Sequence, residues 1–127
     1  MSETRQPTTV MLVDDEDDAR GSLAALLREH DYQVVEAANG AAALRLLRSD
    51  PATCRLILLD LMMPVMNGWD FRRHQRRTAD LAAIPVVLMS AGAKIAIDSD
   101  DLDAAGFISK PVEFDDLLET VRRHTRS

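Results

Sequence analysis

The sequence has a single cysteine, Cys54, and no long apolar run. One cysteine cannot form a disulfide within the chain, which is typical of proteins that work in a reducing cytoplasm. No apolar segment approaches the roughly 20 residues that a membrane-spanning helix needs. The polar residues 1–9 contain no apolar signal-peptide core. These absences predict a cytoplasmic protein without a membrane segment.

Positive charge is scarce as well, because 21 Asp and Glu residues outnumber 15 Lys and Arg residues and give a net charge of −6. Nucleic-acid binding draws most of its affinity from neutralised phosphates, so this balance predicts no nucleic-acid-binding surface. The densest basic stretch is residues 72–77. If Phe71 points inward on a helix, residues 72, 73, 76 and 77 form one solvated outer face.

Internal repeats, low-complexity tracts and linkers are also lacking. The 127 residues, 46% of them apolar, suit one compact domain and leave no room for a second. We expect residues 1–7 to form a disordered tail and residues 8–127 to form the domain.

Short apolar segments alternate with helical patterns along the chain. A continuous apolar run such as residues 56–59 is typical of a strand buried on both faces. By this criterion and by the turn signals between segments, five strands are predicted, at residues 10–13, 33–37, 56–60, 84–89 and 106–109. Helical spacing predicts five helices, at residues 17–30, 40–49, 68–77, 93–105 and 114–124. Asn39 and Asn67 are suitable N-caps for the second and third helices.

This alternation predicts an α/β fold, a doubly wound parallel sheet of five strands in the flavodoxin-like order 2-1-3-4-5. Ligands of such sheets bind at the carboxyl edge, where the first and third strands lie side by side. Polar residues follow four of the strands at this edge: Asp14 and Asp15, Asp60, Ser90 and Lys110.

The residue types at this edge suit phosphoryl chemistry. Three carboxylates close together repel one another, so they need a cation. Hard oxygen ligands suit Mg²⁺, and a carboxylate can act as a nucleophile towards phosphorus. Lys110 would supply a second positive charge and the Ser90 hydroxyl a hydrogen bond. Each residue alone also has a plainer interpretation, as a helix cap, a loop serine or a solvated lysine.

The chain resembles the receiver domain of two-component response regulators over residues 8–124. The segments that carry the resemblance are LVDDE at 12–16, LDLMMPVMNG at 59–68, SA at 90–91 and GFISKP at 106–111. The resemblance implies that Asp60 accepts a phosphoryl group. It also implies Mg²⁺ as a cofactor, with Asp15 as a direct ligand, Asp14 nearby or acting through water, and the backbone carbonyl of Met62 completing the protein ligands.

The resemblance further implies switch residues and partners. Ser90 would move to meet the phosphoryl group, Phe107 would swing inward behind it, and Lys110 would pair with the phosphate, with a cis bond to Pro111. Plain core packing remains an alternative for Phe107. The implied donor is a histidine kinase or a histidine phosphotransfer protein, which we expect on the low-relief surface of the first helix. The implied output surface is the face of helix 93–105, strand 106–109 and helix 114–124.

Several alternatives stay open. The segment between Ser90 and Lys110 is short and unusually acidic for a receiver, which leaves dimerisation through the output surface undecided. A phosphatase that uses Asp60 as its nucleophile would need an acid at position 62, where the chain has Met62, so we expect no enzyme activity beyond self-phosphotransfer and slow autodephosphorylation. A pseudo-receiver that binds partners without phosphorylation is the other alternative. Both a stand-alone receiver and a piece of a larger protein fit the sequence.

Overall fold

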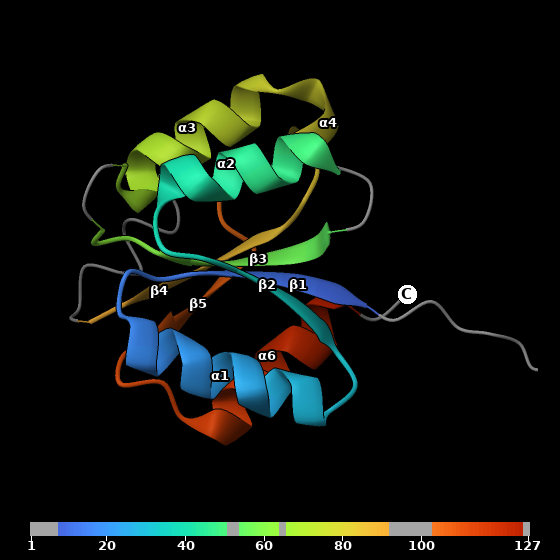
Figure 1. Ribbon diagram of the computed structural model, residues 1–127, viewed down its shortest axis with the longest axis vertical. Coiled ribbons are helices and arrows are strands. Elements are labelled where there is room, and N and C mark those ends of the chain that lie inside the picture. Colours follow the sequence, from blue (N-terminus) through green and yellow to red (C-terminus); the bar gives the residue numbers. More distant parts are fainter. Residues whose placement is uncertain (1–7, 51–53, 64–65, 92–102, 126–127) are drawn as a thin grey trace, which may run out of the picture.

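The computed structural model describes residues 8–50, 54–63, 66–91 and 103–125. Within them, five parallel strands form one sheet in the order β2-β1-β3-β4-β5, which confirms the predicted topology. Helices cover both faces, with α2, α3 and α4 on one side and α1 and α6 on the other (Figure 1). The strands are β1 (Thr9–Val13), β2 (Gln33–Ala37), β3 (Cys54–Asp60), β4 (Val86–Ser90) and β5 (Gly106–Ser109). The helices are α1 (Asp17–Glu29), α2 (Gly40–Ser49), α3 (Gly68–Arg77), α4 (Ala79–Ala82) and α6 (Phe114–Thr125).

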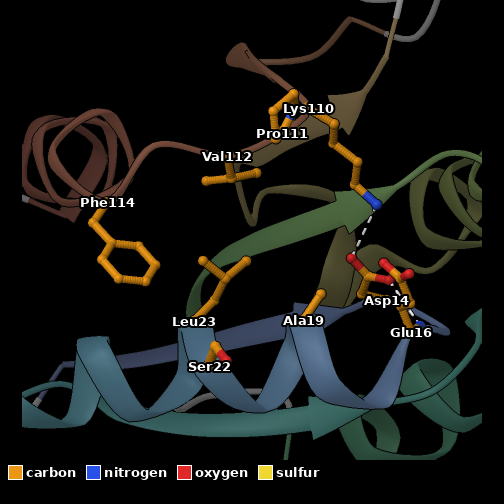
Figure 2. A pocket seen from close by; sticks show the side chains of 9 residues that line it. All are labelled: Asp14, Glu16, Ala19, Ser22, Leu23, Lys110, Pro111, Val112 and Phe114. Carbon is orange, nitrogen blue, oxygen red and sulfur yellow. Dashed lines mark hydrogen bonds and ion pairs between the residues drawn. The ribbon is translucent and has the colours of Figure 1, made fainter.

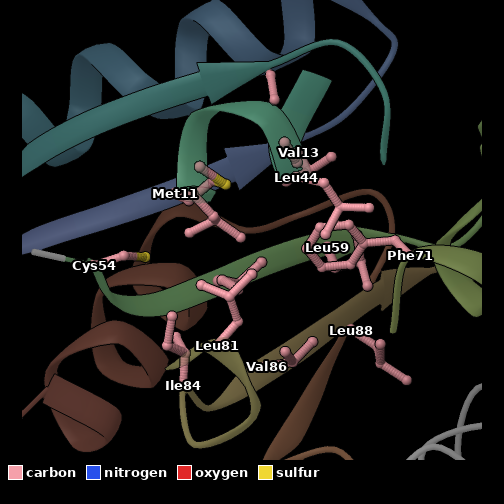
Figure 3. Packing of buried hydrophobic residues seen from close by; sticks show 14 of the residues in the cluster. Met11, Val13, Leu44, Cys54, Leu59, Phe71, Leu81, Ile84, Val86 and Leu88 are labelled. Atoms are coloured by element: carbon pink, nitrogen blue, oxygen red, sulfur yellow. The ribbon is translucent and has the colours of Figure 1, made fainter. Parts of the chain in front are cut away.

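The central strand β3 is buried on both faces because helices cover both sides of the sheet. Alternate side chains of a strand point to opposite faces, so Ile57 and Leu59 join the cluster beneath α2 and α3, which Figure 3 shows around Phe71. Leu56 and Leu58 join the second cluster, which packs against α1 and α6. The strand thereby places its last residue, Asp60, at the end of a run of fully buried residues.

Two asparagines begin helices as predicted. The side-chain oxygen of Asn39 accepts a hydrogen bond from the Ala42 amide, and that of Asn67 accepts one from the Asp70 amide, each at 2.9 Å. Helix α1 begins differently, because its N-cap Glu16 makes no side-chain capping bond. Acidic side chains in its first turn, Asp17 and Asp18, are placed to favour the positive end of the helix dipole.

The structure differs from the sequence analysis in two places. The connection after α3 contains a short helix, α4, that the sequence pattern did not predict. The predicted outer face of residues 72–77 is wrong at Arg72, which is only 5% exposed.

Arg72 is buried because it meets acceptors that lie far apart in the sequence. Its guanidinium donates to Gln75 Oε1 at 2.7 Å and to the carbonyl oxygen of Asp103 at 2.9 Å. Gln75 is itself buried and donates to the carbonyl oxygens of Leu81 and Ile84. Arg72 and Gln75 therefore connect α3 to α4, to the chain between α4 and β4, and to the chain before β5.

Two predicted segments lie outside the described residues: the tail at 1–7 and most of the helix at 93–105. In the part of the chain that the structure describes, no helix is both long and apolar enough to cross a membrane.

Candidate functional site at the carboxyl edge of the sheet

The carboxyl ends of β1 and β3 bring three aspartates together. Val13 pairs with Leu59 in the parallel register, so Asp14 and Asp60 follow on neighbouring strands. The carboxylates of Asp14, Asp15 and Asp60 offer oxygen atoms that all lie within 4.8 Å of one another. Asp14 and Asp60 are 1% and 3% exposed, whereas Asp15 is exposed to solvent. The cluster therefore has two buried carboxylates and one at its mouth.

Backbone hydrogen bonds orient the two buried carboxylates. The Glu16 amide donates to Asp14 Oδ1 at 2.9 Å, and the Met62 amide donates to Asp60 Oδ1 at 3.2 Å. Each aspartate thus accepts a hydrogen bond from the turn that directly follows its strand. Their second oxygens, Oδ2, face the cation described next.

Lys110 joins the two buried aspartates from the end of β5. Its Nζ lies 3.1 Å from Asp14 Oδ2 and 3.3 Å from Asp60 Oδ2, and Figure 2 shows the side chain reaching across to Asp14. The Lys110 amide donates to the Ser90 carbonyl oxygen at 3.0 Å, which ties the lysine backbone to the end of β4. The peptide bond between Lys110 and Pro111 is cis.

Burial and charge act against each other at this site. Burial raises the pKa of Asp60, the Lys110 charge lowers it, and the Asp14 charge raises it again, so that the net shift is upward. Burial by itself would lower the pKa of Lys110, but the hydrogen bond to Asp14 and the charge of Asp60 raise it overall. The lysine is therefore a permanent cation at neutral pH, and it only partly offsets the cost of burying Asp60 in its charged form.

The other predicted site residues lie around this cluster. The Ser90 hydroxyl donates to the Ala91 carbonyl oxygen at 3.3 Å, and within the part of the chain that the structure describes it makes no hydrogen bond to the carboxylates. Phe107 is 48% exposed on the edge strand β5, so it is not a core residue in this conformation. The Met62 side chain is 68% exposed, while its backbone lies against Asp60.

An elongated cavity of about 270 Å³ extends from the cluster along α1. Asp14 and Lys110 lie at one end, and Phe114 lies at the other, as Figure 2 shows. Side chains from α1 and from the β5–α6 connection form its walls: Glu16, Ala19, Ser22, Leu23, Pro111 and Val112. An open and mostly apolar groove therefore adjoins the charged cluster.

Sequence reasoning missed Arg20 and Glu36. Arg20 is only 14% exposed, and it donates to the carbonyl oxygen of Asp14 at 2.6 Å. Its partner Glu36 lies on β2 at 3.1 Å. The i,i+3 spacing to Asp17 is the only signal in the sequence, and it indicates no more than an ordinary ion pair along a helix.

A doubly wound sheet with an acidic, lysine-bridged cluster at its switch point defines the class of domain. A family model of the response regulator receiver domain matches residues 10–122, and the chain belongs to this family of two-component signalling proteins. Receiver domains are signalling modules rather than enzymes, and they interact with histidine kinases and with downstream partners. They bind Mg²⁺ in an acidic pocket, for which the three aspartates are the matching feature here.

Individual relatives agree with this assignment. The chain is 29% identical to protein PilH of Pseudomonas aeruginosa over 117 residues, which cover 88% of this chain and 93% of PilH. It is 36% identical to response regulator Rre1 of Synechocystis over 92% of this chain, but it spans only about half of Rre1, 51%. Among solved structures, chemotaxis protein CheY4 of Vibrio cholerae matches with a TM-score of 0.85 and 26% identity, covering 94% of this chain and 99% of CheY4. The receiver domain of hybrid histidine kinase CckA matches with a TM-score of 0.78 and 29% identity, covering 93% and 99% of the two chains.

Proposed function

We propose that Asp60 accepts a phosphoryl group from a histidine kinase or a histidine phosphotransfer protein, and that phosphorylation changes the partners of the chain. One observation supports this assignment most directly. Asp60 is the carboxylate that ends the central strand, and it lies within reach of Lys110 Nζ and of two further carboxylates. A nucleophile, a fixed cation and oxygen ligands for a metal are the parts that phosphoryl transfer needs.

The transfer is a displacement at phosphorus. An Asp60 carboxylate oxygen forms a bond to the phosphorus atom, and the phosphorus–nitrogen bond to the donor histidine breaks. The departing imidazole nitrogen keeps the electron pair and takes up a proton. Lys110 is placed to neutralise the phosphoryl oxygens, and Ser90 at the end of β4 can donate its hydroxyl hydrogen to one of them.

The cluster fits Mg²⁺ by its donor chemistry. Asp15 and Asp60 supply hard carboxylate oxygens, Asp14 supplies one nearby or through a water molecule, and the backbone carbonyl of Met62 would complete the protein ligands. When bound, the ion would offset the charge of the carboxylates and of the incoming phosphoryl group. An ion with this role accounts for three carboxylates in a pocket where burial already raises the pKa of Asp60.

The response to phosphorylation would run through Ser90, Lys110 and Phe107. A phosphoryl group adds close to two negative charges near neutral pH, and these would draw the Ser90 hydroxyl and the lysine towards Asp60. Phe107 is half-exposed on β5 and can bury its ring if the end of β4 moves. The result would be a population shift between two packings of the output surface, of which the structure describes β5 and α6 and where a downstream protein binds.

We expect the phosphoryl donor to dock on α1. Beside its charged residues, this helix carries a stretch of small residues, with Gly21, Ser22 and Ala25 exposed and Ala19 half-buried. The apolar groove beside it leads to Asp14 and Lys110. Ala25→Arg should slow phosphotransfer from the cognate donor. Ala82→Arg, at an exposed alanine on the opposite face of the sheet, should not. Equal transfer rates for both variants would contradict docking on α1.

The phosphorylated state should be long-lived, because no described side chain next to Asp60 is suited to activating an attacking water molecule. The position two residues after Asp60 carries the thioether of Met62 instead of a carboxylate or an amide. The same feature argues against a phosphatase, which needs a general acid there. Decay as rapid as that of chemotaxis-type receivers would contradict this part of the proposal.

The test is the intact mass of the protein after incubation with acetyl phosphate and Mg²⁺. We expect one added phosphoryl group, and no addition to Asp60→Asn or in the presence of EDTA. The pseudo-receiver alternative predicts no addition from either acetyl phosphate or a histidine donor. It also predicts no Mg²⁺-dependent change in the fluorescence of Trp69, which lies at the start of α3, close to the Asp60 loop. A cytoplasmic location and the absence of nucleic-acid binding belong to the same proposal, and they rest on the cysteine count, the net charge and the nature of the donor.

A further inference from the structure

The guanidinium of Arg20 is held by three groups beside the acidic cluster. It donates to the Asp14 carbonyl oxygen at 2.6 Å, and it pairs with Asp17 at 2.8 Å and with Glu36 at 3.1 Å. Only 14% of its side chain is exposed. Arg20 comes from the first turns of α1, Glu36 from β2 and Asp14 from the end of β1, so one side chain connects three elements.

These contacts secure the peptide groups on both sides of the Asp14 side chain. The Asp14 amide donates to the carbonyl oxygen of Ala37 at 3.1 Å, and the Asp14 carbonyl accepts from Arg20. Ala37 directly follows Glu36, the other partner of Arg20. The end of β2 therefore contacts both the Asp14 amide and the Arg20 side chain. Because hydrogen bonds fix both peptide groups of Asp14, the backbone sets the direction in which its buried carboxylate points. The carboxylate oxygens themselves do not contact Arg20.

We propose that Arg20, braced by Glu36, is a positioning residue for divalent-cation binding at the acidic cluster. This inference rests on the proposed function of the cluster as a Mg²⁺ site. Mg²⁺ accepts only near-ideal octahedral geometry, so a carboxylate that can tilt or shift binds it more weakly. Residues that orient a metal ligand without touching the metal commonly change affinity by about tenfold or more.

Charge and geometry predict opposite effects when Arg20 is replaced. Arg20 carries a positive charge close to the carboxylates, so its removal on electrostatic grounds alone would strengthen the binding of a cation. Loss of positioning would weaken binding. The sign of the change in Mg²⁺ affinity therefore distinguishes a positioning residue from a charge that merely happens to be nearby.

Arg28 provides the matched control. It pairs with the same glutamate, at 3.3 Å from Glu36 Oε2, and it also donates to a backbone carbonyl oxygen, that of Val34. No described contact links it to Asp14. Arg28→Met therefore removes one positive charge and one Glu36 contact while leaving the support of the cluster in place.

The experiment titrates Mg²⁺ into the full chain and follows Trp69 fluorescence and calorimetric heat for the wild type, Arg20→Met, Arg20→Lys and Arg28→Met. We expect Kd to rise about tenfold for Arg20→Met and to stay near the wild-type value or fall slightly for Arg28→Met. Arg20→Lys keeps the charge but loses the planar fork of donors, so its Kd should lie between those of the wild type and Arg20→Met. Circular dichroism and urea unfolding in EDTA establish that each variant is folded. If Arg20→Met does not fold, the comparison is made with Arg20→Lys instead.

The outcomes separate the two hypotheses. If the wild type binds Mg²⁺ and the Arg20 variants bind it equally well or more tightly, the positioning role is refuted and the proposed function stands. Equal weakening by Arg20→Met and Arg28→Met would also refute it, because the effect would then come from Glu36 or from general destabilisation. If the wild type does not bind Mg²⁺, both the inference and the metal-dependent function are refuted.

Discussion

Replacing Asp60, the aspartate that ends the central strand, should stabilise the metal-free protein. Asp60 is buried with two other carboxylates nearby, and its pKa is raised, so its ionised form costs folding free energy. Asp60→Asn removes the charge and keeps the shape. The asparagine side-chain oxygen can still accept the hydrogen bond from the Met62 amide, and Lys110 keeps Asp14 as its partner. We therefore expect a larger free energy of unfolding for the variant at neutral pH without Mg²⁺.

The magnitude follows from the distances at the site. With an effective dielectric constant of about 20, unit charges within 4.8 Å of each other repel by at least about 3.5 kcal/mol, and unit charges 3.3 Å apart attract by about 5 kcal/mol. Lys110 thus outweighs Asp14 by at most about 1.5 kcal/mol, and the solvent-screened Asp15 reduces that difference further. What remains is the cost of burying a carboxylate, several kcal/mol before local hydrogen bonds are counted. After allowing for the retained bond from Met62, we expect Asp60→Asn to gain about 1–2 kcal/mol.

The assay is urea unfolding in EDTA at several pH values, with Asp15→Asn as the control for an exposed carboxylate. Because the folded-state pKa of Asp60 is raised above its unfolded value near 3.9, the cost of its charge is fully present above the folded-state pKa. This cost disappears as the pH falls towards the unfolded value. The stability gain of Asp60→Asn should therefore shrink as the pH is lowered from 7 towards 4, and the gain of Asp15→Asn should be smaller at pH 7. An Asp60→Asn protein that is no more stable than the wild type at pH 7 would refute the reasoning.

Four further substitutions, in two pairs, test the packing of the domain, each by urea unfolding. Arg72→Met should destabilise the fold by about 1–3 kcal/mol, because buried acceptors that include Gln75 lose their donor, while the exposed Arg73→Ala should cost less than about 1 kcal/mol. Gly68→Ala should cost about 1–3 kcal/mol, since its new Cβ would lie 2.8 Å from a backbone atom of the loop after Asp60. Gly21→Ala, in open space on α1, should instead stabilise the protein by about 0.5–1 kcal/mol. Equal effects within either pair would contradict the packing described here.

The sheet could be predicted from sequence because its signals are local. Residues 10–13 and 56–59 are continuously apolar, with no alternation of polar and apolar residues. A strand that is buried on both faces has this pattern because neither face can carry polar side chains. The caps Asn39 and Asn67 are equally local, since each bonds to an amide three residues on. Right-handed crossovers then leave few strand orders to consider. The short helix α4 has only four residues, too few for a periodic pattern to show.

The positions of Asp14, Asp60 and Lys110 could be predicted for a topological reason. Each follows a strand, and parallel strands bring their carboxyl ends to one edge whatever the side chains are. The pairing of Lys110 with both aspartates is a matter of side-chain distance, and no spacing in the sequence encodes it. The same holds for Phe107, whose place on an edge strand is predictable while its exposure is not.

Arg20 and Arg72 show where helical periodicity stops being informative. Periodicity assigns each residue to a face of its helix by the direction of its Cβ atom, but an arginine side chain can carry its guanidinium well away from that direction. Arg20 thereby reaches β2 and the end of β1, and Arg72 reaches the chain before β5. In this domain the backbone topology determines the positions of Asp14, Asp60 and Lys110, the residues proposed to carry the chemistry. The groups that hold them in place are long side chains whose partners, such as Glu36 for Arg20, lie on elements that only the folded structure brings near.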